Sequence, residues 1–273
     1  MKLAGAPMKV LIKLGGTLLD EPAKRADMAQ QLAAIAGLCE LVVVHGGGKQ
    51  VTRFLEERGV KSEFVNGLRV SGEAVISAVT QVIAGGINKQ LVAAIISAGR
   101  SAVGLSGVDG ALTQAVQLSP ELQFAGKPVS SNGTLLNLLV HAGYLPIVAC
   151  LAADLEGNIY NVNADQMAVS CAVGWHADKL FFLTDVPGVK DGDGRTLSHL
   201  NELEIRQLIS AGVAHGGMQA KLESAVWALE SGLSEVVVAP GHAPNICSDL
   251  LAGMSGGTRI SLLNTQQPMG ASH

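Results

Sequence analysis

Six short apolar runs recur along the chain, and segments with the apolar spacing of helices separate most of them. These runs are rich in Val, Ile and Leu, and they lie at residues 10–14, 41–44, 102–105, 145–150, 180–183 and 236–239. Strands that are apolar on both faces and alternate with helices are typical of a mainly parallel sheet that helices cover on two sides. The pattern therefore predicts an α/β protein.

Eight segments carry apolar residues at helical spacing, and a glycine near the end of most of them favours helix termination. The predicted helices are residues 23–36, 49–57, 72–84, 88–98, 133–141, 164–174, 202–209 and 218–229. Residues 113–129 alternate weakly around Ser119 and Pro120, which indicates a hairpin outside the layered pattern.

We expect a single domain over residues 1–273, with one continuous sheet whose two halves act as lobes. The N-terminal lobe would cover about residues 1–155 and the C-terminal lobe about residues 156–264, with the division near residues 151–158. Polar and turn-forming residues at 265–273 predict a loose tail.

The composition restricts the classes of partner. The 273 residues are 48% hydrophobic and 15% charged, and nine of them are aromatic (five Phe, two Trp, two Tyr), which excludes a disordered chain and a module that stacks bases on aromatic rings. With 19 Lys and Arg against 23 acidic residues, the net charge of −4 leaves no basic excess for a phosphate backbone. Nucleic acid and anionic membranes are therefore not expected partners.

Neither a membrane span nor a signal peptide is expected. The longest apolar stretch, residues 144–153, has ten residues and contains Pro146, whereas a spanning helix needs about 20. The apolar residues near the N-terminus, 10–12, are too few for a signal peptide. The four cysteines show no CxxC spacing, which favours buried, reduced thiols. We therefore expect a cytoplasmic protein.

Two glycine clusters follow the first two predicted strands, KLGG at residues 13–16 and HGGG at residues 45–48. Both fall at carboxyl ends of strands, where open α/β sheets bind ligands. Glycines let backbone N–H groups approach an anion closely, and a helix that begins near Lys49 would direct its positive end to the same place. Turn formation is the alternative for one cluster alone, but two clusters after consecutive strands favour a phosphate site.

Lys13 interrupts a strand that is otherwise predicted to be buried on both faces. A lysine in that position is costly unless an anion meets it. The alternative is a lysine at the exposed end of the strand.

Further polar residues stand at the starts of two predicted helices. Capping by Asn163 explains one of them, whereas three amides and a carboxylate, Asp165, within residues 161–166 favour a polar site. Lys221 lies one turn into the helix at 218–229, where a lysine can reach a phosphate held near the N-terminus. A solvated helix lysine is the alternative for Lys221.

A turn-rich loop at residues 184–190 leaves the fifth predicted strand in a position to hold a nucleotide. The adjacent DGDG at residues 191–194 is similar to the start of a calcium loop. Arg195 and Thr196, however, occupy the fifth and sixth positions, where a ligand and a glycine belong. A hairpin turn is therefore expected there.

Seven motifs, in this order, resemble the amino acid kinase family, in particular its members that phosphorylate N-acetyl-L-glutamate. They are KLGG at 13–16, HGGG at 45–48, NGLRV at 66–70, GLSGVDG at 104–110, NVNADQ at 161–166, DVPGV at 185–189 and GGMQAK at 216–221. The resemblance implies a three-layer α/β/α sandwich with a mainly parallel central sheet, the acceptor in the N-terminal lobe and ATP in the C-terminal lobe. The implied reaction is phosphorylation of the side-chain carboxylate of N-acetyl-L-glutamate, the second step of arginine biosynthesis.

The resemblance also implies roles for individual residues. Lys13 and Lys221 would neutralise charge on the transferring phosphoryl group, and Asp165 would hold their ammonium groups in place. Arg69 and Asn161 would bind the α-carboxylate of the acceptor, a task that suits the two-donor fork of arginine. The other implied contacts are Asn163, Gly46 and Gly47 for the acceptor, Gly15, Gly16 and Gly46 for the phosphoryl group, and Asp185, Val186, Pro187, Gly188, Val189, Lys190, Val213, Ala214 and His215 for the nucleotide.

This chemistry requires no general base. A γ-carboxylate has a reference pKa of about 4.3, so it is already a nucleophile at neutral pH. Lysines, glycine amides and a magnesium ion that bridges the phosphates would offset its repulsion from ATP. We expect ATP with Mg2+ as the cofactor and no metal ligands from protein side chains.

Two departures from the family pattern stand out. Lys49 occupies a position where the family pattern has proline. We expect it to begin a helix in solvent; the alternative is an additional positive charge near the acceptor. Eight residues precede Lys9, too few for the additional N-terminal helix of the arginine-inhibited hexamers, so we expect an arginine-insensitive homodimer.

Two alternative functions stay open. One is a kinase for aminoadipate bound to a carrier protein, in lysine biosynthesis. The other is a catalytically silent nucleotide or amino-acid sensor on the same fold, which the joint presence of Lys13, Asp165 and Lys221 disfavours.

Overall fold

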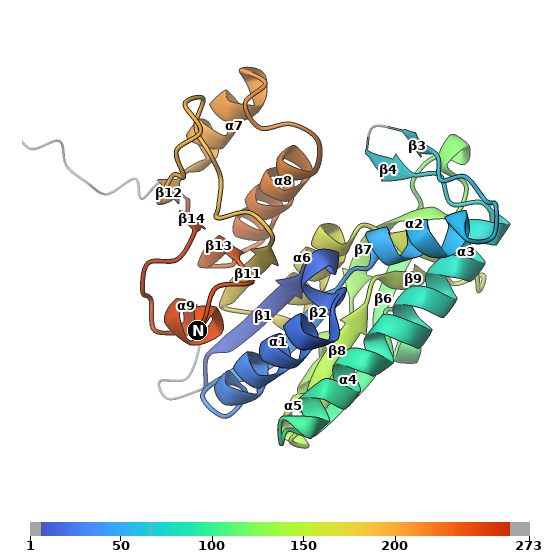
Figure 1. The fold of residues 1–273 in the computed structure, drawn as a ribbon, viewed down its shortest axis with the longest axis horizontal. Helices are drawn as coiled ribbons and strands as arrows, with labels where there is room; N and C mark the ends of the chain where they lie inside the picture. The colour runs from blue at the N-terminus through green and yellow to red at the C-terminus, as the bar shows by residue number, and fades with distance from the viewer. Residues whose placement is uncertain (1–6, 66, 263–273) are drawn as a thin grey trace, which may run out of the picture.

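An eight-stranded sheet runs through the centre of the computed structural model, which describes residues 7–65 and 67–262 (Figure 1). The strand order is β12-β14-β13-β11-β1-β2-β8-β5. Neighbouring strands are parallel except β13 and β14, which are antiparallel. The mainly parallel sheet predicted from the sequence is confirmed.

The predicted elements are present with boundaries that shift by a few residues. The strands of the central sheet are β1 (Lys9–Leu14), β2 (Glu40–His45), β5 (Ala102–Ser106), β8 (Leu145–Ala149), β11 (Lys179–Thr184), β12 (His199–Leu200), β13 (Glu235–Pro240) and β14 (Thr258–Ile260). The helices are α1 (Pro22–Ile35), α2 (Gly48–Glu56), α3 (Glu73–Val79), α4 (Asn88–Ser97), α5 (Gly133–His141), α6 (Ala164–Trp175), α7 (Glu202–Ser210), α8 (Gly216–Glu230) and α9 (Ile246–Leu251). Short 3-10 helices are η1 (Gly16–Leu19), η3 (Asp109–Ala111) and η4 (Pro120–Leu122), and η2 (Thr80–Ile87) is a π-helix. Helix α9 was not predicted, because its six residues are too few for a helical period to be recognised.

Alternate residues of the central strands pack on opposite faces of the sheet. Leu11 and Val42 belong to the core that α6 and α8 cover, whereas Ile12 and Val43 belong to the core beneath α1, α4 and α9. Because the side chains of a strand alternate between faces and both faces are covered, the interior residues of these strands are mostly apolar. The result is the three-layer α/β/α arrangement expected from the family resemblance.

A second set of strands stands apart from this sheet. The strands β6 (Thr113–Gln117), β7 (Ala125–Ser131), β9 (Leu151–Ala153) and β10 (Ile159–Val162) form a small closed barrel, and β3 (Phe64–Val65) pairs with β4 (Leu68–Arg69) in a hairpin. The hairpin predicted at residues 113–129 is confirmed as β6 and β7. The expected continuous sheet is present, because all six predicted apolar runs lie in the eight-stranded sheet. The small barrel and the β3-β4 hairpin are additional to it, and their strands of two to four residues carry no detectable alternation.

The division into two lobes near residues 151–158 stays a prediction. Strand β10 follows the expected division near residues 151–158, yet it pairs with β7 and β9, which precede or overlap that division. Residues 265–273, predicted as a loose tail, lie outside the described residues.

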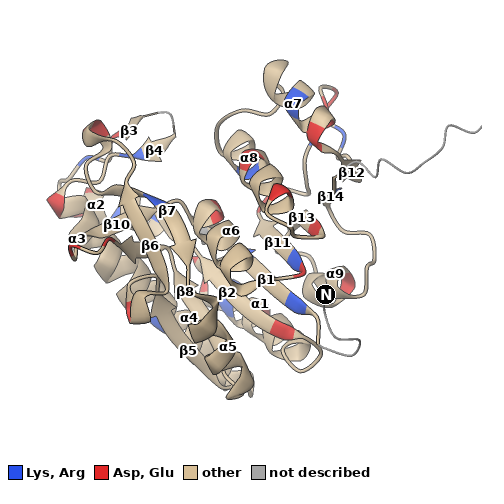
Figure 2. Ribbon diagram, turned by 180° about the vertical axis from the view of Figure 1, so that it is seen from behind, with Lys and Arg blue, Asp and Glu red and all other residues tan. Residues whose placement is uncertain are grey.

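Two features bear on the expected absence of membrane and nucleic-acid partners. Together, α3, η2 and α4 form one continuous helix from Glu73 to Ser97. By length and composition alone, this helix could cross a membrane, and no other helix in the described ranges meets the same criteria. Buried core helices pass the same test, and Val79 and Leu91 of this helix are core residues. The sequence predicted two helices here, at residues 72–84 and 88–98, with Gly85 and Gly86, which have low helix propensity, between them. Basic and acidic positions are interspersed over both halves of the molecule in Figure 2.

Candidate active site

Three charged side chains from three elements meet at the carboxyl end of the central strands. The Nζ of Lys13, from β1, lies 2.8 Å from Oδ1 of Asp165, and the Nζ of Lys221, from α8, lies 2.7 Å from Oδ2. Each of the three residues is less than a tenth exposed, at 9%, 7% and 7%. The anion that the buried Lys13 requires is therefore Asp165, whose two oxygens each face one ammonium group.

The electrostatics of the cluster favour a bound anion. Burial alone would raise the pKa of the Asp165 carboxyl, but the charges of Lys13 and Lys221 hold it well below its ordinary value, so the group is ionised. Burial, with the nearby Lys13 charge, lowers the pKa of Lys221 to about 8, although Asp165 and Asp185 act in the opposite direction. Two ammonium groups and one carboxylate leave the cluster with a net positive charge at neutral pH.

The start of α6 holds Asp165 in place. The side-chain oxygen of Asn163 accepts hydrogen bonds from the backbone N–H groups of Asp165, at 2.8 Å, and Gln166, at 3.3 Å. Asn163 is thus the helix cap, and Asp165 in the first turn belongs to the charged cluster. The positive end of the helix dipole adds to the field of the two lysines.

In the second glycine loop, a side chain at Gly46 or Gly47 would crowd a neighbour, most severely at Gly47. A Cβ at Gly46 would lie 3.2 Å from Cβ of Ala164, and one at Gly47 would lie 2.4 Å from Cδ1 of Ile87. The N–H of Gly15 donates to the carbonyl of Leu183 at 2.9 Å, which ties the first loop to β11. Close packing, in addition to turn formation, therefore explains these glycines.

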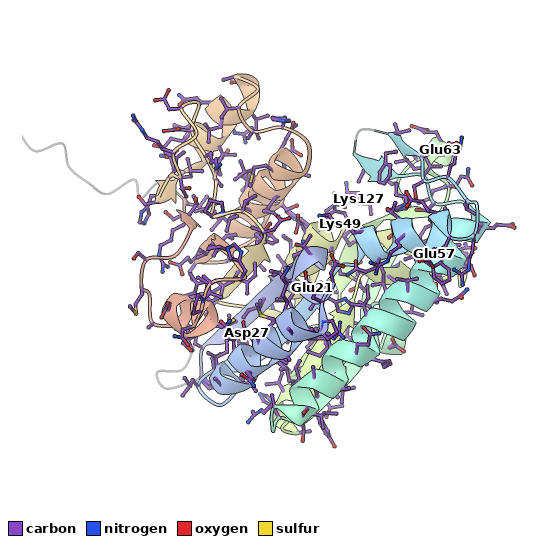
Figure 3. All side chains as sticks on the ribbon, in the orientation of Figure 1. Glu21, Asp27, Lys49, Glu57, Glu63 and Lys127 are labelled. Atoms are coloured by element: carbon purple, nitrogen blue, oxygen red, sulfur yellow. The ribbon has the colours of Figure 1, made fainter. Side chains whose placement is uncertain are left out.

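The residues next to the glycines start two helices. Gly16 is the first residue of the 3-10 helix η1. Lys49 lies in the first turn of α2 and is exposed, as expected from the sequence (Figure 3).

A cavity of about 180 Å³ lies next to the second glycine loop. Its polar lining includes Arg69, Asn161 and Asn163, and its apolar lining includes Val79 and Ile83. The structure thus brings together the residues that the family resemblance assigns to the acceptor. Polar groups that converge in an otherwise apolar cavity are typical of a small-molecule site.

The neighbours of Arg69 orient its guanidinium group. Its Nη2 donates to the carbonyl of Gly48 at 3.0 Å and to Oγ1 of Thr52 at 2.7 Å, and its Nη1 donates to Oγ of Ser62. The ring of Phe64 lies 4.7 Å from the guanidinium carbon. These contacts fix the orientation of the guanidinium group at the cavity, where its positive charge suits recognition of a carboxylate.

Asn161 is connected to Arg69 through a third residue. The Nδ2 of Asn161 donates to Oγ of Ser71 at 3.0 Å, and that hydroxyl donates to the backbone carbonyl of Arg69, also at 3.0 Å. The sequence did not predict the roles of Ser71, Thr52 and Ser62, because isolated hydroxyl residues carry no spacing signal.

The residues expected at the nucleotide form two neighbouring segments. Residues 185–190 follow β11, and residues 213–215 lead into α8; a Cβ at Gly192 would lie 3.8 Å from a methyl group of Val213. Val189 and Ala214 are only 1% and 3% exposed, so their side chains belong to the core. Contacts of these two residues with a nucleotide would therefore have to come from the backbone.

The DGDG segment forms the predicted turn. Lys190 and Thr196 pair as an antiparallel bridge, and the carboxylate of Asp191 accepts from the N–H groups of Asp193 and Arg195, each at 2.9 Å. The prediction of a hairpin turn is confirmed.

Comparisons with known proteins identify the family. Residues 8–240 match the model of the amino acid kinase family. The chain is 52% identical over 254 residues to acetylglutamate kinase from Solibacter usitatus. The aligned region covers 93% of this chain and 99% of the relative. It is 40% identical over 240 residues to acetylglutamate kinase from Cereibacter sphaeroides, with 87% of this chain and 82% of the relative covered.

A solved structure agrees with this result. The structure of N-acetylglutamate synthase from Neisseria gonorrhoeae, complexed with coenzyme A and N-acetyl-glutamate, matches with a TM-score of 0.83 and 26% identity. The match covers 94% of this chain and 60% of the synthase chain. The family model, the extensive identity to curated relatives and the shared architecture agree, and the chain belongs to the amino acid kinase family.

Proposed function

We propose that this chain is an acetylglutamate kinase, which transfers the γ-phosphoryl group of ATP to the γ-carboxylate of N-acetyl-L-glutamate in arginine biosynthesis. The observation that carries the proposal is the buried cluster of Lys13, Asp165 and Lys221 near a cavity that contains Arg69 and Asn161. The names of the two relatives compared above support the same activity.

The acceptor site follows from the charges in the cavity. We assign the α-carboxylate of N-acetyl-L-glutamate to Arg69 and Asn161, which offer guanidinium and amide donors. The remainder of the acceptor then extends along the cavity to Gly46 and Gly47, which lie at the same cavity. The γ-carboxylate reaches the glycine loop as an anion and attacks without losing a proton.

The transfer step exchanges one bond to phosphorus for another. An oxygen of the γ-carboxylate forms a bond with the γ-phosphorus of ATP, the bond between that phosphorus and the β,γ-bridging oxygen breaks, and ADP leaves with the electron pair. Lys13 and Lys221 stabilise the negative charge on the transferring group. Asp165 positions both ammonium groups and accepts no proton, because each of its oxygens already faces a lysine.

We propose that magnesium enters as part of the ATP complex. Both oxygens of Asp165 face ammonium groups, and the described residues contain no group of three or more His, Cys, Asp or Glu side chains that could hold a metal ion. The phosphate oxygens of ATP supply the hard ligands that Mg2+ prefers. The protein then binds the MgATP complex as its substrate, through residues 185–190 and 213–215.

We also propose that the enzyme is a cytoplasmic homodimer. Strand β5 forms one edge of the central sheet, and Ile96 on the adjacent α4 is 54% exposed. An unpaired strand edge beside an exposed apolar side chain favours pairing with a second copy. The four cysteines are free, as is typical of a reducing compartment. Sedimentation at several protein concentrations tests the dimer, and a monomer at micromolar concentration contradicts it.

Trapping of the acyl phosphate as a hydroxamate tests the activity. The expected signal depends on ATP and appears with N-acetyl-L-glutamate but not with glutamate, aspartate, N-acetyl-aminoadipate or UMP. Thermal protection by ATP without a hydroxamate from any of these acceptors contradicts the proposal and favours the carrier-bound substrate or the sensor.

A further inference from the structure

A buried polar chain lies beneath the second glycine loop, and none of the steps above uses it. It runs from Asn88, the first residue of α4, through His45, the last residue of β2, to the carbonyl of Gly46. Asn88 is 1% exposed and His45 is fully buried. Polar groups buried this deeply are retained only at a cost unless hydrogen bonds satisfy them.

The partners of Asn88 determine which way its amide points. Its Nδ2 lies 2.9 Å from the carbonyl oxygen of Ile147, which can only accept, and 3.0 Å from Nε2 of His45. Its Oδ1 accepts from the ammonium group of Lys89 at 3.1 Å. The reversed amide would place oxygen against oxygen and NH2 against an ammonium group. Asn88 therefore donates to Nε2 of His45, which carries no proton.

His45 consequently has its proton on Nδ1. That nitrogen lies 3.0 Å from the carbonyl oxygen of Gly46 and donates to it. Burial lowers the pKa of the ring to about 4; the bond to Gly46 acts in the opposite direction, and the Lys89 charge lowers it further. The ring is therefore neutral near pH 7, with one tautomer selected by Asn88.

The bond to the Gly46 carbonyl orients the next peptide N–H. In a trans peptide the C=O and the following N–H point in opposite directions, and none of the described peptide bonds is cis. Because the Gly46 carbonyl points to His45, the Gly47 N–H points away from His45. Gly47 lines the acceptor cavity, and its N–H makes no bond to a backbone carbonyl among the described residues.

The π-helix η2 packs against the same glycine loop through two isoleucine side chains. Its residues Ile83 and Ile87 lie so close that a Cβ at Gly47 would be 3.1 Å and 2.4 Å from their side chains. Asn88 follows Ile87 directly, so apolar contacts and the polar chain act on the loop from one stretch of helix. Turns of π-helix are rare and occur frequently at functional sites.

We propose that Asn88 is a positioning residue for phosphoryl transfer: through His45 it orients the peptide between Gly46 and Gly47, so that the Gly47 N–H points toward the transferring phosphoryl group. This inference rests on the function proposed above. A preorganised N–H donor stabilises charge that develops in the transition state, so its loss lowers kcat more than it raises KM.

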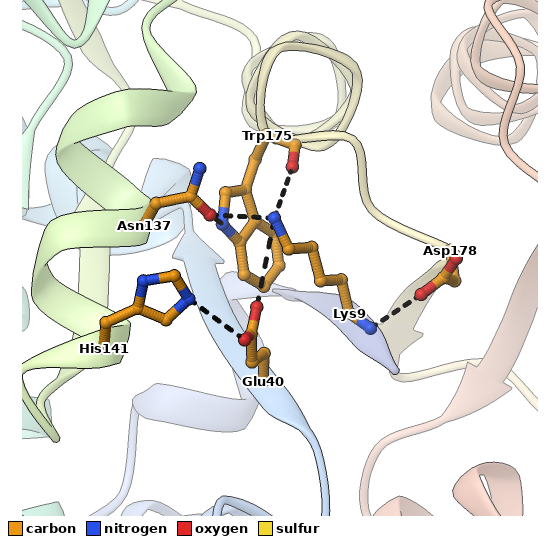
Figure 4. Close-up of polar contacts among 6 residues, drawn as sticks. All are labelled: Lys9, Glu40, Asn137, His141, Trp175 and Asp178. Carbon is orange, nitrogen blue, oxygen red and sulfur yellow. Dashed lines mark hydrogen bonds and ion pairs between the residues drawn. The ribbon is translucent and has the colours of Figure 1, made fainter. Parts of the chain in front are cut away.

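Three variants test the hydrogen-bonded path from Asn88 through His45 to Gly46. Asn88→Leu and His45→Phe each lower kcat for hydroxamate formation by at least about tenfold, with KM values within about threefold of wild type. The double variant has the kcat of His45→Phe alone, because Asn88 acts only through His45. The matched control is Asn137→Leu, which removes an asparagine that accepts from Lys9 at 2.8 Å and Trp175 at 2.9 Å, a cluster at the opposite end of β1 (Figure 4). Its kcat stays within about twofold of wild type.

A wild-type kcat in Asn88→Leu overturns the proposal, as do effects that multiply in the double variant. Nitrogen-15 NMR of histidine-labelled wild-type protein tests it without a variant that has to fold. We expect one ring that does not titrate between about pH 5 and 8 and carries its proton on Nδ1. Absence of such a ring overturns the proposal. If the wild type forms no hydroxamate from N-acetyl-L-glutamate, the proposed function fails, and the NMR result still decides the tautomer.

Discussion

Replacement of Asp165 by asparagine removes one charge and leaves the size of the side chain unchanged. In the wild type, Oδ1 lies 2.8 Å from Nζ of Lys13 and Oδ2 lies 2.7 Å from Nζ of Lys221. The amide of the variant has a single oxygen, so its NH2 group must face one of the two ammonium groups. That lysine loses its partner in a buried position, and the two lysines repel each other without a carboxylate between them.

The structure sets the expected magnitude. Lys13 and Lys221 are 9% and 7% exposed, so solvent screens them poorly. Removal of one partner from a buried ion pair costs about 3–5 kcal/mol in the free energy of unfolding. Displacement of a catalytic group by about 1 Å costs about a hundredfold in rate. We therefore expect Asp165→Asn to lower kcat by at least about a hundredfold and to reduce the free energy of unfolding.

The assay is hydroxamate formation at saturating substrates, with urea unfolding measured in parallel. The matched control is Glu235→Gln, because Glu235 also bridges two cations, with Nζ of Lys179 at 3.2 Å and Nη1 of Arg259 at 2.5 Å. Glu235 is the first residue of β13, so this pair of bridges lies at the amino end of the sheet and the Asp165 cluster at the carboxyl end. The control is expected to lose stability but to keep kcat within about twofold. A wild-type kcat in Asp165→Asn would refute the positioning role of the carboxylate.

Three further predictions follow from the same geometry. The pKa of Lys221 is lowered to about 8, and its protonated form stabilises the phosphoryl group. We therefore expect kcat/KM for ATP to be highest below pH 8 and to decrease as the pH rises through that value, and Lys221→Arg to remove the decrease. A wild-type profile that is flat up to about pH 10 contradicts this role of Lys221. Arg69→Lys loses the two-donor fork, so steady-state kinetics will show KM for N-acetyl-L-glutamate raised by at least about tenfold, and an unchanged KM rules out that contact. Gly47→Ala places a methyl group 2.4 Å from Cδ1 of Ile87 and lowers kcat, whereas addition of Ile87→Val, which lacks that atom, restores part of it; no recovery in the double variant counts against this collision.

The sequence predicted those features that depend on neighbouring residues. The apolar runs at residues 10–14 and 180–183 revealed β1 and β11, because a strand buried on both faces has no polar alternation. The cap at Asn163 was visible for a similar reason, since an N-cap acts within one turn of its own helix. Elements of two to four residues were missed, as the barrel strands β9 and β10 show.

The candidate site was predicted only in part. The unusual position of Lys13 indicated that an anion must meet it, but nothing near Lys13 in the chain identified Asp165. Family motifs supplied Arg69 and Asn161, whereas Ser71, which connects them, belongs to no recognisable pattern. The nucleotide segment included Val189, whose side chain proved to be buried in the core.

By itself, the sequence determined the α/β class, most strands and helices and the glycine loops at their ends, because periodicity, caps and turns act over a few residues. Only the tertiary structure decided which charges pair and which polar groups are satisfied. Asp165 and Lys221 are 56 residues apart, and His45 and Asn88 are 43 apart, yet each pair is in hydrogen-bond contact. Such contacts arise when distant strands and helices pack into layers, since a buried charge or amide is tolerated only where the fold brings it a partner.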